Sequence, residues 1–218
     1  MRKMDKHITA PFDKKQVEEL HAGDYVYISG VIYSARDAAH KRMYDTLIEN
    51  ENDESKLPIK LEGNVIYYLG PTPAREGQVI GSAGPTTSSR MDKYTPLILS
   101  KGLNGMIGKG KRSQAVIDAI VENKAVYFAA VGGAGALLSK CIKKSEVVAY
   151  DDLGTEAIRN QFLVTMLSEI SCHTIQFHPF SDHCILTFRT RLGKFLIKTS
   201  PCSEQPALHI QFIGHIPA

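Results

Sequence analysis

The feature that most constrains the fold is an alternation of short apolar runs with amphipathic segments between Met106 and Tyr150. Val126 to Val131 (VYFAAV) is continuously apolar, which is typical of a strand buried on both faces of a sheet. The segment that follows Ser113 has helical spacing, with an apolar side formed by Val116, Ile117, Ile120 and Val121. Strands that alternate with helices pair in parallel through right-handed crossovers. The sequence therefore predicts an α/β domain.

The amino-terminal part of the chain adds two strands and a helix to this pattern. Residues 25–34 (YVYISGVIYS) alternate in the manner of a strand and are rich in residues that favour β-structure. Ala35 to Glu51 places Ala39, Met43 and Leu47 at four-residue spacing, which predicts an amphipathic helix. Val65 to Leu69 (VIYYL) is the next predicted strand, and the glycine and prolines that follow it indicate a loop.

Four consecutive hydroxyl residues and an arginine stand in the stretch GSAGPTTSSRMDKY, from Gly81 to Tyr94. Serine and threonine cap helices, so we expect a helix to begin among Thr86 to Ser89 and to end by Gly102. A helix start carries partial positive charge, and Arg90 adds a planar fork of donors that matches a carboxylate or phosphate. Two interpretations remain open: an anion site, or a well-capped helix whose arginine forms a structural ion pair.

Two further cations are candidates for contact with an anion. Arg36 stands in the first turn of a predicted helix, where a cation is unfavourable unless an anion lies nearby; pairing with Asp37 or with a distant carboxylate is the alternative. Lys109 follows a predicted strand and is flanked by glycines that allow close approach to a ligand, whereas Lys111 and Arg112 are expected to face solvent. Loops at the carboxyl ends of parallel strands are where ligands bind.

The chemistry that these residues allow is limited. The α/β part offers no Ser/His/Asp order, no metal-ligand cluster and no paired carboxylates near the predicted anion site. The glycines of GGAGALLSK, from Gly132 to Lys140, lack the spacing of a phosphate loop, so close packing explains them better. Arg36, Arg90 and Lys109, together with the Thr86 hydroxyl, suit a small dicarboxylate. An electrophile that activates a leaving group would have to come from a partner.

Composition excludes several other classes of protein. The net charge of +3 over 218 residues is modest and its lysines and arginines are scattered, which does not favour a nucleic-acid-binding protein. No apolar run approaches the length of a membrane span, and the first residues lack the apolar region of a signal peptide. The four cysteines form no CxxC pair and are expected to be reduced thiols. We therefore expect a cytoplasmic protein that binds neither nucleic acid nor membrane.

Several segments together resemble one family. ARDAAHKR, GPTPAREGQVIGSAGPTTSSRMD, GLNGMIGKGKRS, AVYFAAVGGAGALLSK and EVVAYDDLGTEAI occur in this order between residues 35 and 158. They resemble the beta subunit, or carboxyl-terminal domain, of class I iron-sulfur fumarate hydratases. The similarity covers about Ile8 to Ile158. The L-tartrate dehydratase beta subunit shares this domain type, but TPAREGQ and SAGPTTSSRM are more similar to the fumarase segments.

The resemblance implies a fold, an assembly and a reaction. The fold is a swivelling β/β/α domain, with mixed strands and parallel βαβ crossovers, that closes over an alpha subunit carrying a [4Fe-4S] cluster on three cysteines. The cluster's free iron acts as a Lewis acid in the family, so this hetero-oligomer interconverts L-malate with fumarate and water. No cofactor or metal ligand is expected in this chain. Tartrate dehydratase, or a non-catalytic anion-binding module, is the alternative.

The resemblance also assigns roles to the four candidate residues. It implies that Arg36, Arg90 and Lys109 hold the substrate carboxylates, and that Thr86 takes the C3 proton as the catalytic base. A threonine hydroxyl is a poor base unless neighbouring cations and a helix dipole favour its alkoxide. Asp37 and His40 are expected to cap or pair, ahead of any role in orienting Arg36.

The resemblance stops after Arg159, so we divide the chain into a fumarase beta-type domain, 1–160, and an atypical tail, 161–218. The tail holds three of the four cysteines and five of the eight histidines, which indicates a foreign or frame-shifted ending. Cys172, His173, His178, His183 and Cys184 fit no standard zinc spacing. The alternation in CILTFRTRLGKFLIK allows a β-hairpin with Gly193 in its turn, or the tail is poorly ordered.

Overall fold

The computed structural model describes residues 6–170, 185–190 and 193–198, and the chain divides after residue 176 into two compact units. The strands of the first unit are β1 (Lys6–Ala10), β2 (Tyr25–Ser34), β3 (Val65–Tyr67), β4 (Gly105–Gly108), β5 (Val126–Ala129), β6 (Ile142–Ala149) and β7 (Ile158–Ile170). Its helices are α1 (Lys14–Glu18), α2 (Asp37–Glu49), α3 (Thr95–Ser100), α4 (Gln114–Glu122) and α5 (Gly135–Leu138). Short 3₁₀ turns are η1 (Glu54–Lys56), η2 (Ser88–Met91), η3 (Ser139–Cys141) and η4 (Asp151–Glu156).

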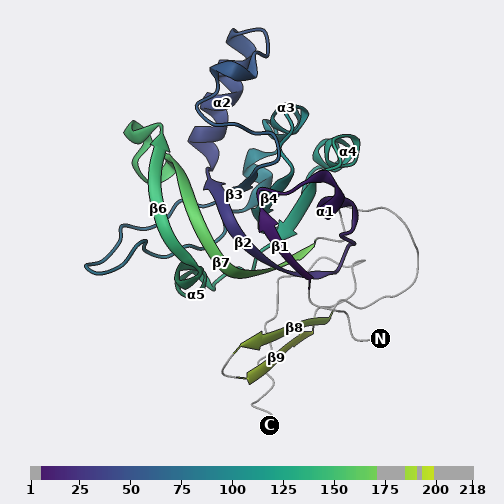
Figure 1. The fold of residues 1–218 in the computed structure, drawn as a ribbon, viewed down its shortest axis with the longest axis vertical. Coiled ribbons are helices and arrows are strands. Elements are labelled where there is room, and N and C mark those ends of the chain that lie inside the picture. The colour runs from purple at the N-terminus through teal and green to yellow at the C-terminus, as the bar shows by residue number, and fades with distance from the viewer. Residues whose placement is uncertain (1–5, 171–184, 191–192, 199–218) are drawn as a thin grey trace. The chain divides into compact units, whose positions relative to one another are not determined.

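The seven strands form one mixed sheet in the order β1-β2-β3-β4-β5-β7-β6 (Figure 1). Each neighbouring pair from β1 to β5 is parallel, whereas β7 is antiparallel to β2, to β5 and to β6. Because β7 pairs with both β2 and β5, the strands β2, β3, β4, β5 and β7 form a closed ring. The predicted α/β class with parallel crossovers is confirmed, and the antiparallel β7 makes the sheet mixed.

Alternate residues of the central strands supply two separate cores. Val65 and Tyr67 of β3 belong to one cluster of buried residues, on the inner face of the ring. Ile66 and Tyr68 belong to the other, between the outer face of the ring and helices α2, α3 and α4 (Figure 1). A strand covered on both faces has no solvent side, which is why these strands are continuously apolar.

Helix α2 packs as its sequence predicts, whereas the apolar face predicted for α4 is partly wrong. Ala39, Met43 and Leu47 are fully buried on the sheet side of α2. In α4, Val116, Ala119 and Ile120 are buried, while Val121 is 61% exposed. The position of Val121, 100° around the helix from Ile120, turns it away from the sheet.

The helix predicted to begin among Thr86 to Ser89 starts there only as a 3₁₀ turn, while its predicted end by Gly102 is confirmed. That stretch forms the 3₁₀ turn η2, and the α-helix begins only at Thr95, with proline in its first turn. The backbone before η2 is extended and bonds to neighbouring strands instead: the Thr86 N–H donates to the Tyr68 carbonyl at 2.7 Å, and the Ser88 N–H donates to the Lys109 carbonyl at 2.8 Å. Groups engaged in strand-like pairing are not available for the first turn of a helix.

The predicted domain boundary after residue 160 falls inside β7, which continues to Ile170. In the second unit, described by itself, β8 (Ile185–Thr190) pairs antiparallel with β9 (Gly193–Lys198), with Thr190 opposite Gly193. The histidines and cysteines weighed as metal ligands lie outside the described residues. The division into two domains and the origin of the tail stay predictions.

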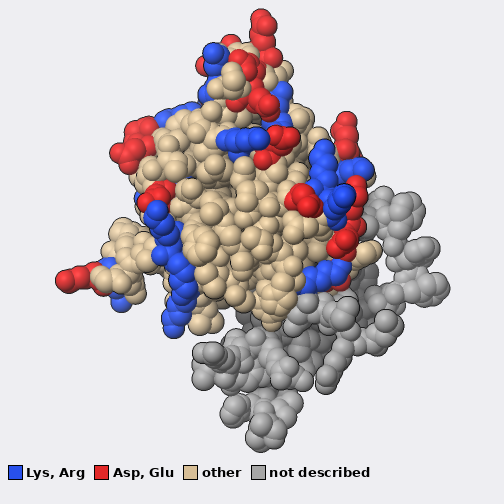
Figure 2. Space-filling model, in the orientation of Figure 1, with Lys and Arg blue, Asp and Glu red and all other residues tan. Residues whose placement is uncertain are grey.

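Charged side chains of both signs are interspersed on the face of the molecule that Figure 2 shows. In the described part of the chain, no helix is both long and apolar enough to cross a membrane.

His40 is a polar residue within the core between α2 and the sheet. Its side chain is buried, its Nδ1 lies 3.1 Å from the Arg36 carbonyl, and its ring meets the Tyr68 ring edge-on at 5.1 Å. Burial lowers the pKa of His40 to about 4, so the ring is neutral near pH 7. His40 therefore acts as a structural partner of the α2 start, as expected from the sequence.

Ring closure predicts a stability difference between two adjacent residues of β7. Leu163 is fully buried, whereas Phe162 is 44% exposed. We expect Leu163→Ala to lower the free energy of unfolding by about 2–5 kcal/mol, because it leaves a cavity in the ring, and Phe162→Ala to lower it by less than about 1 kcal/mol. Urea denaturation followed by circular dichroism measures both. Equal losses of unfolding free energy in Leu163→Ala and Phe162→Ala would contradict the inclusion of residues beyond 160 in the folded domain.

The buried His40 predicts acid lability. Its pKa is lower in the folded than in the unfolded chain, so between about pH 6.5 and pH 4 the unfolded chain binds more protons. The stability contributed by neutral His40 is complete above that window and is lost as the pH falls through it. We expect urea midpoints to fall less steeply over this range in His40→Gln than in the wild type. The control His21→Gln, at an exposed histidine, should keep the wild-type slope of urea midpoint against pH. The same slope in the wild type and both variants would refute the attribution of this acid lability to His40.

Candidate functional site

The carboxyl ends of the parallel strands gather the predicted site residues at one edge of the sheet. Arg36 lies two residues after β2, and Lys109 directly follows β4. The segment before η2, which contains Thr86, bonds to the residues that follow β3 and β4. Segments far apart in sequence are adjacent here because β2, β3 and β4 are parallel neighbours.

Arg36 contacts a carboxylate that sequence reasoning missed. Its Nη2 donates to Oε1 of Glu156 at 2.6 Å, and the other oxygen of Glu156 accepts the Ala38 N–H at 2.8 Å. Glu156 therefore pairs with Arg36 and also caps the start of α2, where an anion is favoured. Both pairing alternatives considered for Arg36 are present, with the distant carboxylate of Glu156 at 2.6 Å and that of Asp37 at 3.9 Å. No local pattern points to Glu156, which lies 120 residues away from Arg36.

Asp37 brings Arg36 and Arg90 together. Arg90 Nε donates to Asp37 Oδ1 at 2.7 Å, while Arg36 Nε lies 3.9 Å from Asp37 Oδ2. Arg36 Nε and Asp37 Oδ2 are both buried without a hydrogen-bond partner among the described residues. The Arg90 side chain is 52% exposed, and neither of its Nη groups bonds to a described residue. Arg90 is therefore oriented through Nε and keeps donors for a further anion.

Gly70 provides the surface on which Arg36 lies. A Cβ at this position would stand 2.7 Å from Arg36 Nε and 2.8 Å from Cζ, well inside van der Waals contact. A side chain at residue 70 would therefore displace the guanidinium, and glycine is required for this close approach.

Thr86 and Lys109 form the second linked pair. The Lys109 N–H donates to the Thr86 carbonyl at 3.3 Å, and an isolated bridge joins Lys109 to Thr87. Thr86 is buried at 9% exposure, whereas Lys109 is half-buried. The Lys109 side chain passes Gly132, where a Cβ would lie 3.6 Å from Lys109 Cδ. The two pairs are connected through Tyr68, whose carbonyl accepts the Thr86 N–H and which lies two residues before Gly70.

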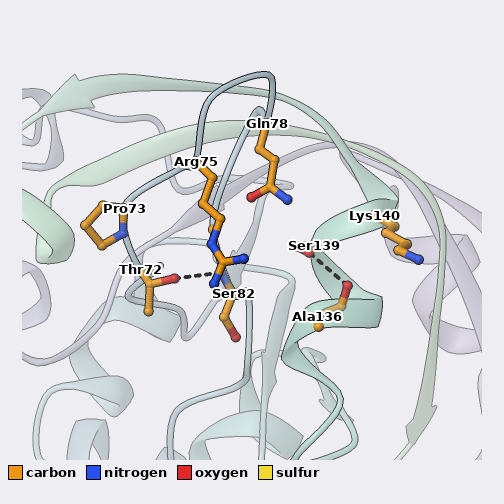
Figure 3. A pocket seen from close by; sticks show the side chains of 9 residues that line it. Thr72, Pro73, Arg75, Gln78, Ser82, Ala136, Ser139 and Lys140 are labelled. Carbon is orange, nitrogen blue, oxygen red and sulfur yellow. Dashed lines mark hydrogen bonds between the residues drawn. The ribbon is translucent and has the colours of Figure 1, made fainter.

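A cavity of about 340 Å³ lies beside this edge, between the loop after β3 and helix α5. In Figure 3 the guanidinium of Arg75 reaches toward Thr72 and Ser82, while Lys140 points away from them. None of the four predicted site residues lines this cavity. A single pocket shared by all four side chains stays a prediction.

Of the glycines after β5, Gly135 has the packing role that the sequence analysis favoured, whereas a Cβ on Gly133 would meet nothing within 4 Å. A Cβ on Gly135 would lie 2.3 Å from Ser82 Oγ and 3.0 Å from the Gly84 nitrogen. The Ala83 N–H also donates to the Gly135 carbonyl at 3.0 Å. Gly135 thus lets α5 pack directly against the segment that leads into the hydroxyl stretch.

The expectation that Arg112 faces solvent is wrong. Its side chain is only 1% exposed, and its Nε donates to Asp92 Oδ1 at 2.8 Å. The guanidinium also lies against the rings of Tyr68 and Tyr127, with its carbon 5.3 and 5.2 Å from their centroids. Arg112 is one of three cations in GKGKR, a pattern typical of a solvated basic loop. Its burial is visible only in the structure, where the strands that lead to Tyr68 and carry Tyr127 bring both rings against it.

The described residues do not fit an iron-sulfur cluster. They contain no group of three histidine, cysteine or acidic side chains placed to hold a metal ion, and Cys141 is their single cysteine. Burial raises the pKa of the Cys141 thiol, which disfavours the thiolate that a metal requires.

Comparison with known proteins shows extended similarity to hydro-lyases. Residues 3–172 match the family described as Fumarase C-terminus. The aerobic class I fumarate hydratase of Escherichia coli K12 is 36% identical over 145 residues, which cover 66% of this chain and 26% of that protein. Fumarate hydratase 2 of Leishmania major is 36% identical over 152 residues, or 68% of this chain and 26% of that protein.

A further relative is close to this chain in length. A Methanocaldococcus jannaschii protein, provisionally named L(+)-tartrate dehydratase subunit beta, is 38% identical over 145 residues, covering 65% of this chain and 72% of that protein. Against the fumarate hydratases, by contrast, the chain spans only about a quarter of their length. Since the family match covers most of the chain and includes Arg36, Thr86, Arg90 and Lys109, this protein belongs to the Fumarase C-terminus family of class I fumarate hydratases and tartrate dehydratase beta subunits.

Proposed function

We propose that this chain is the beta subunit of an iron-sulfur hydro-lyase that interconverts L-malate with fumarate and water. The observation that carries the proposal is the link through Asp37 between Arg36 and Arg90, at the same sheet edge where Thr86 is bonded to Lys109. In this proposal a partner alpha subunit carries the [4Fe-4S] cluster, and the chain acts as a swivelling β/β/α domain that closes over it. The closed ring, with helices α2, α3 and α4 over its outer face, is compatible with such a domain.

The charges at this edge support a dicarboxylate. Arg36, Arg90 and Lys109 carry three positive charges, against the two carboxylates of Asp37 and Glu156. The excess cation and the outward donors of Arg90 favour an anion, and a guanidinium matches a carboxylate in a bidentate geometry. Arg36 would share its donors between Glu156 and the substrate. In this arrangement the arginines orient the substrate and Lys109 adds a compact charge.

Thr86 is proposed to move the proton at C3. Its alkoxide oxygen would bond to the C3 proton as the C3–H bond breaks, and that electron pair would form the C2=C3 double bond as the C2–OH bond breaks. The hydroxide would leave toward the Lewis acid that the partner's cluster would supply, and return of the proton from Thr86 would release water and restore the alkoxide. A threonine needs stabilisation of its alkoxide for this role. Lys109, whose N–H donates to the Thr86 carbonyl, and Arg90, four residues after Thr86, would supply the positive charge. The low exposure of Thr86 excludes water from competing with the substrate.

Tartrate dehydration is the second candidate within the same chemistry. The provisionally named tartrate dehydratase subunit beta matches over a larger share of its own length than the fumarate hydratases do. Identities of 35–38% do not separate the two substrates. A non-catalytic anion-binding module is a candidate from another class, favoured if the tail prevents assembly with a cluster-bearing partner.

The decisive experiment is anaerobic co-expression of the full chain with a cluster-bearing alpha subunit encoded in the same genome. We expect the assembly to release fumarate from L-malate, followed by the ultraviolet absorbance of fumarate. Turnover of tartrate without malate would favour the second candidate. Dicarboxylate binding without turnover of either substrate would favour the non-catalytic module.

Within this assembly, Arg90→Ala should weaken malate use. A hydrogen bond to a charged group contributes about 1.5–3 kcal/mol, so we expect a loss of about 10- to 100-fold in kcat/KM, mostly through KM. Arg75→Ala is the matched control, since Arg75 is also an exposed arginine but lies in the neighbouring loop and contacts none of the four site residues. Steady-state kinetics on malate measure both variants. An unchanged KM in Arg90→Ala would refute its role in binding.

A further inference from the structure

A buried polar network lies directly below the loops that carry the candidate site. At its centre is Arg112, whose Nη2 donates to Thr95 Oγ1 at 2.9 Å and whose Nη1 donates to the Tyr68 hydroxyl at 3.2 Å. Its Nε pairs with Asp92, and Asp92 Oδ2 also accepts the Ser113 N–H at 2.7 Å. All three guanidinium nitrogens thus have partners of defined geometry.

Burial of the Arg112 guanidinium is costly in free energy, so other interactions must compensate for its lost hydration. Removing a guanidinium from water costs several kcal/mol, and a well-packed apolar residue in place of a buried pair is often as stable. Here the Asp92 carboxylate and the faces of Tyr68 and Tyr127 compensate for the lost hydration. Because a buried ion pair adds little net stability, the geometry it imposes is the more informative property.

Tyr127 extends the network to the two loops of the site. Its hydroxyl donates to the Gly110 carbonyl at 3.0 Å and lies 2.8 Å from Ser88 Oγ. Ser88 fits closely against β4: a Cβ on Gly108 would stand only 2.1 Å from Ser88 Oγ. The phenol therefore bonds simultaneously to the segment before Arg90 and to the residue after Lys109.

The network connects the rigid strands to the chain segments that bear the candidate residues. Tyr68 and Tyr127 belong to the outer face of the ring, which is covered by helices. Ser88 stands between Thr86 and Arg90, and Asp92 follows Arg90 by two residues. Two loops that share few backbone hydrogen bonds are thereby held in a defined position relative to each other and to the sheet.

We propose that Arg112 is a positioning residue, which fixes the Thr86–Arg90 segment relative to Lys109 through Asp92, Thr95 and the two tyrosines. Arg112 itself is buried away from any anion bound between Arg90 and Lys109. The identity of that anion as a dicarboxylate substrate rests on the proposed function, whereas the mechanical coupling of the two loops does not. Arg112→Met and Tyr127→Phe disrupt the network at its charge and at its hydroxyl, respectively.

Hydrogen exchange on the full chain tests the coupling without requiring turnover. We expect both variants to speed amide exchange at Ser88 and Lys109, whose N–H groups join the loops, by at least about tenfold, because loss of these contacts permits local opening. Amides in α2 should keep their wild-type rates. Lys111→Met, at the adjacent exposed cation, is the matched control and should change neither region. Equal acceleration throughout the sheet, or none at the loops, would overturn the proposal.

Kinetics of the chain assembled with its alpha subunit provide the second measurement. Displacement of reacting groups by about 1 Å costs about 100-fold in rate, so Arg112→Met should lower kcat/KM for malate by about 10- to 100-fold. Tyr127→Phe should lower it by a smaller factor at an unchanged unfolding temperature, and Lys111→Met not at all. Succinate, a dicarboxylate that cannot eliminate water, should inhibit both network variants more weakly. A smaller active fraction with unchanged KM and succinate inhibition would indicate a purely structural role and overturn the proposal.

The two measurements distinguish failure of this proposal from failure of the proposed function. If the wild-type assembly turns over neither malate nor tartrate, the proposed function fails, while the exchange rates at Ser88 and Lys109 still decide the role of Arg112. If the wild type is active and the exchange at both loops is unchanged in Arg112→Met, the positioning role fails alone.

Discussion

Backbone hydrogen bonds from β7 to both β2 and β5 close the sheet into a ring, and the position of every candidate residue depends on that closure. The ring keeps β2, β3 and β4 parallel and adjacent, so the residues that follow them emerge at one edge. Its outer face carries Tyr68 and Tyr127, against which the loops of the candidate site are packed. The antiparallel β7 thus fixes the spacing of loops to which it contributes no candidate residue.

The second constraint is electrostatic. Arg36 and Arg90 would repel each other at this edge without Asp37 between them and Glu156 at the start of α2. These carboxylates hold the guanidinium groups in place before any ligand arrives, which reduces the ordering cost of binding. The same carboxylates compete with a bound anion for Arg36. Under the proposed function we therefore expect a preference for a doubly charged ligand, because a single carboxylate would gain less from displacing these internal contacts.

The errors of sequence reasoning share a cause. The hydroxyls from Thr86 onwards match helix-capping preferences, yet the backbone at Thr87 is extended and only a short 3₁₀ turn follows. The Thr86 and Ser88 N–H groups bond instead to the carbonyls of Tyr68 and Lys109, which directly follow strands elsewhere in the sequence. Arg112 follows glycines in a basic pentapeptide, yet it is buried because Asp92 and two tyrosines from separate strands surround it. Local propensity is a weak prior wherever long-range bonds compete for the same groups. Helix α2 was predictable because its periodicity agrees with its tertiary packing.

The amino-acid sequence by itself determined the α/β class, the strands at Tyr25 and Val65, the packing face of α2 and, through its motifs, the family to which the chain belongs. These properties follow from side-chain periodicity and from short motifs, which are visible over a few neighbouring residues. Only the tertiary structure decided that the sheet closes into a ring, that Glu156 caps α2 and pairs with Arg36, and that Arg112 is buried below the site. Each of these depends on contacts between residues distant in the chain, and their geometry arises only when the strands have paired.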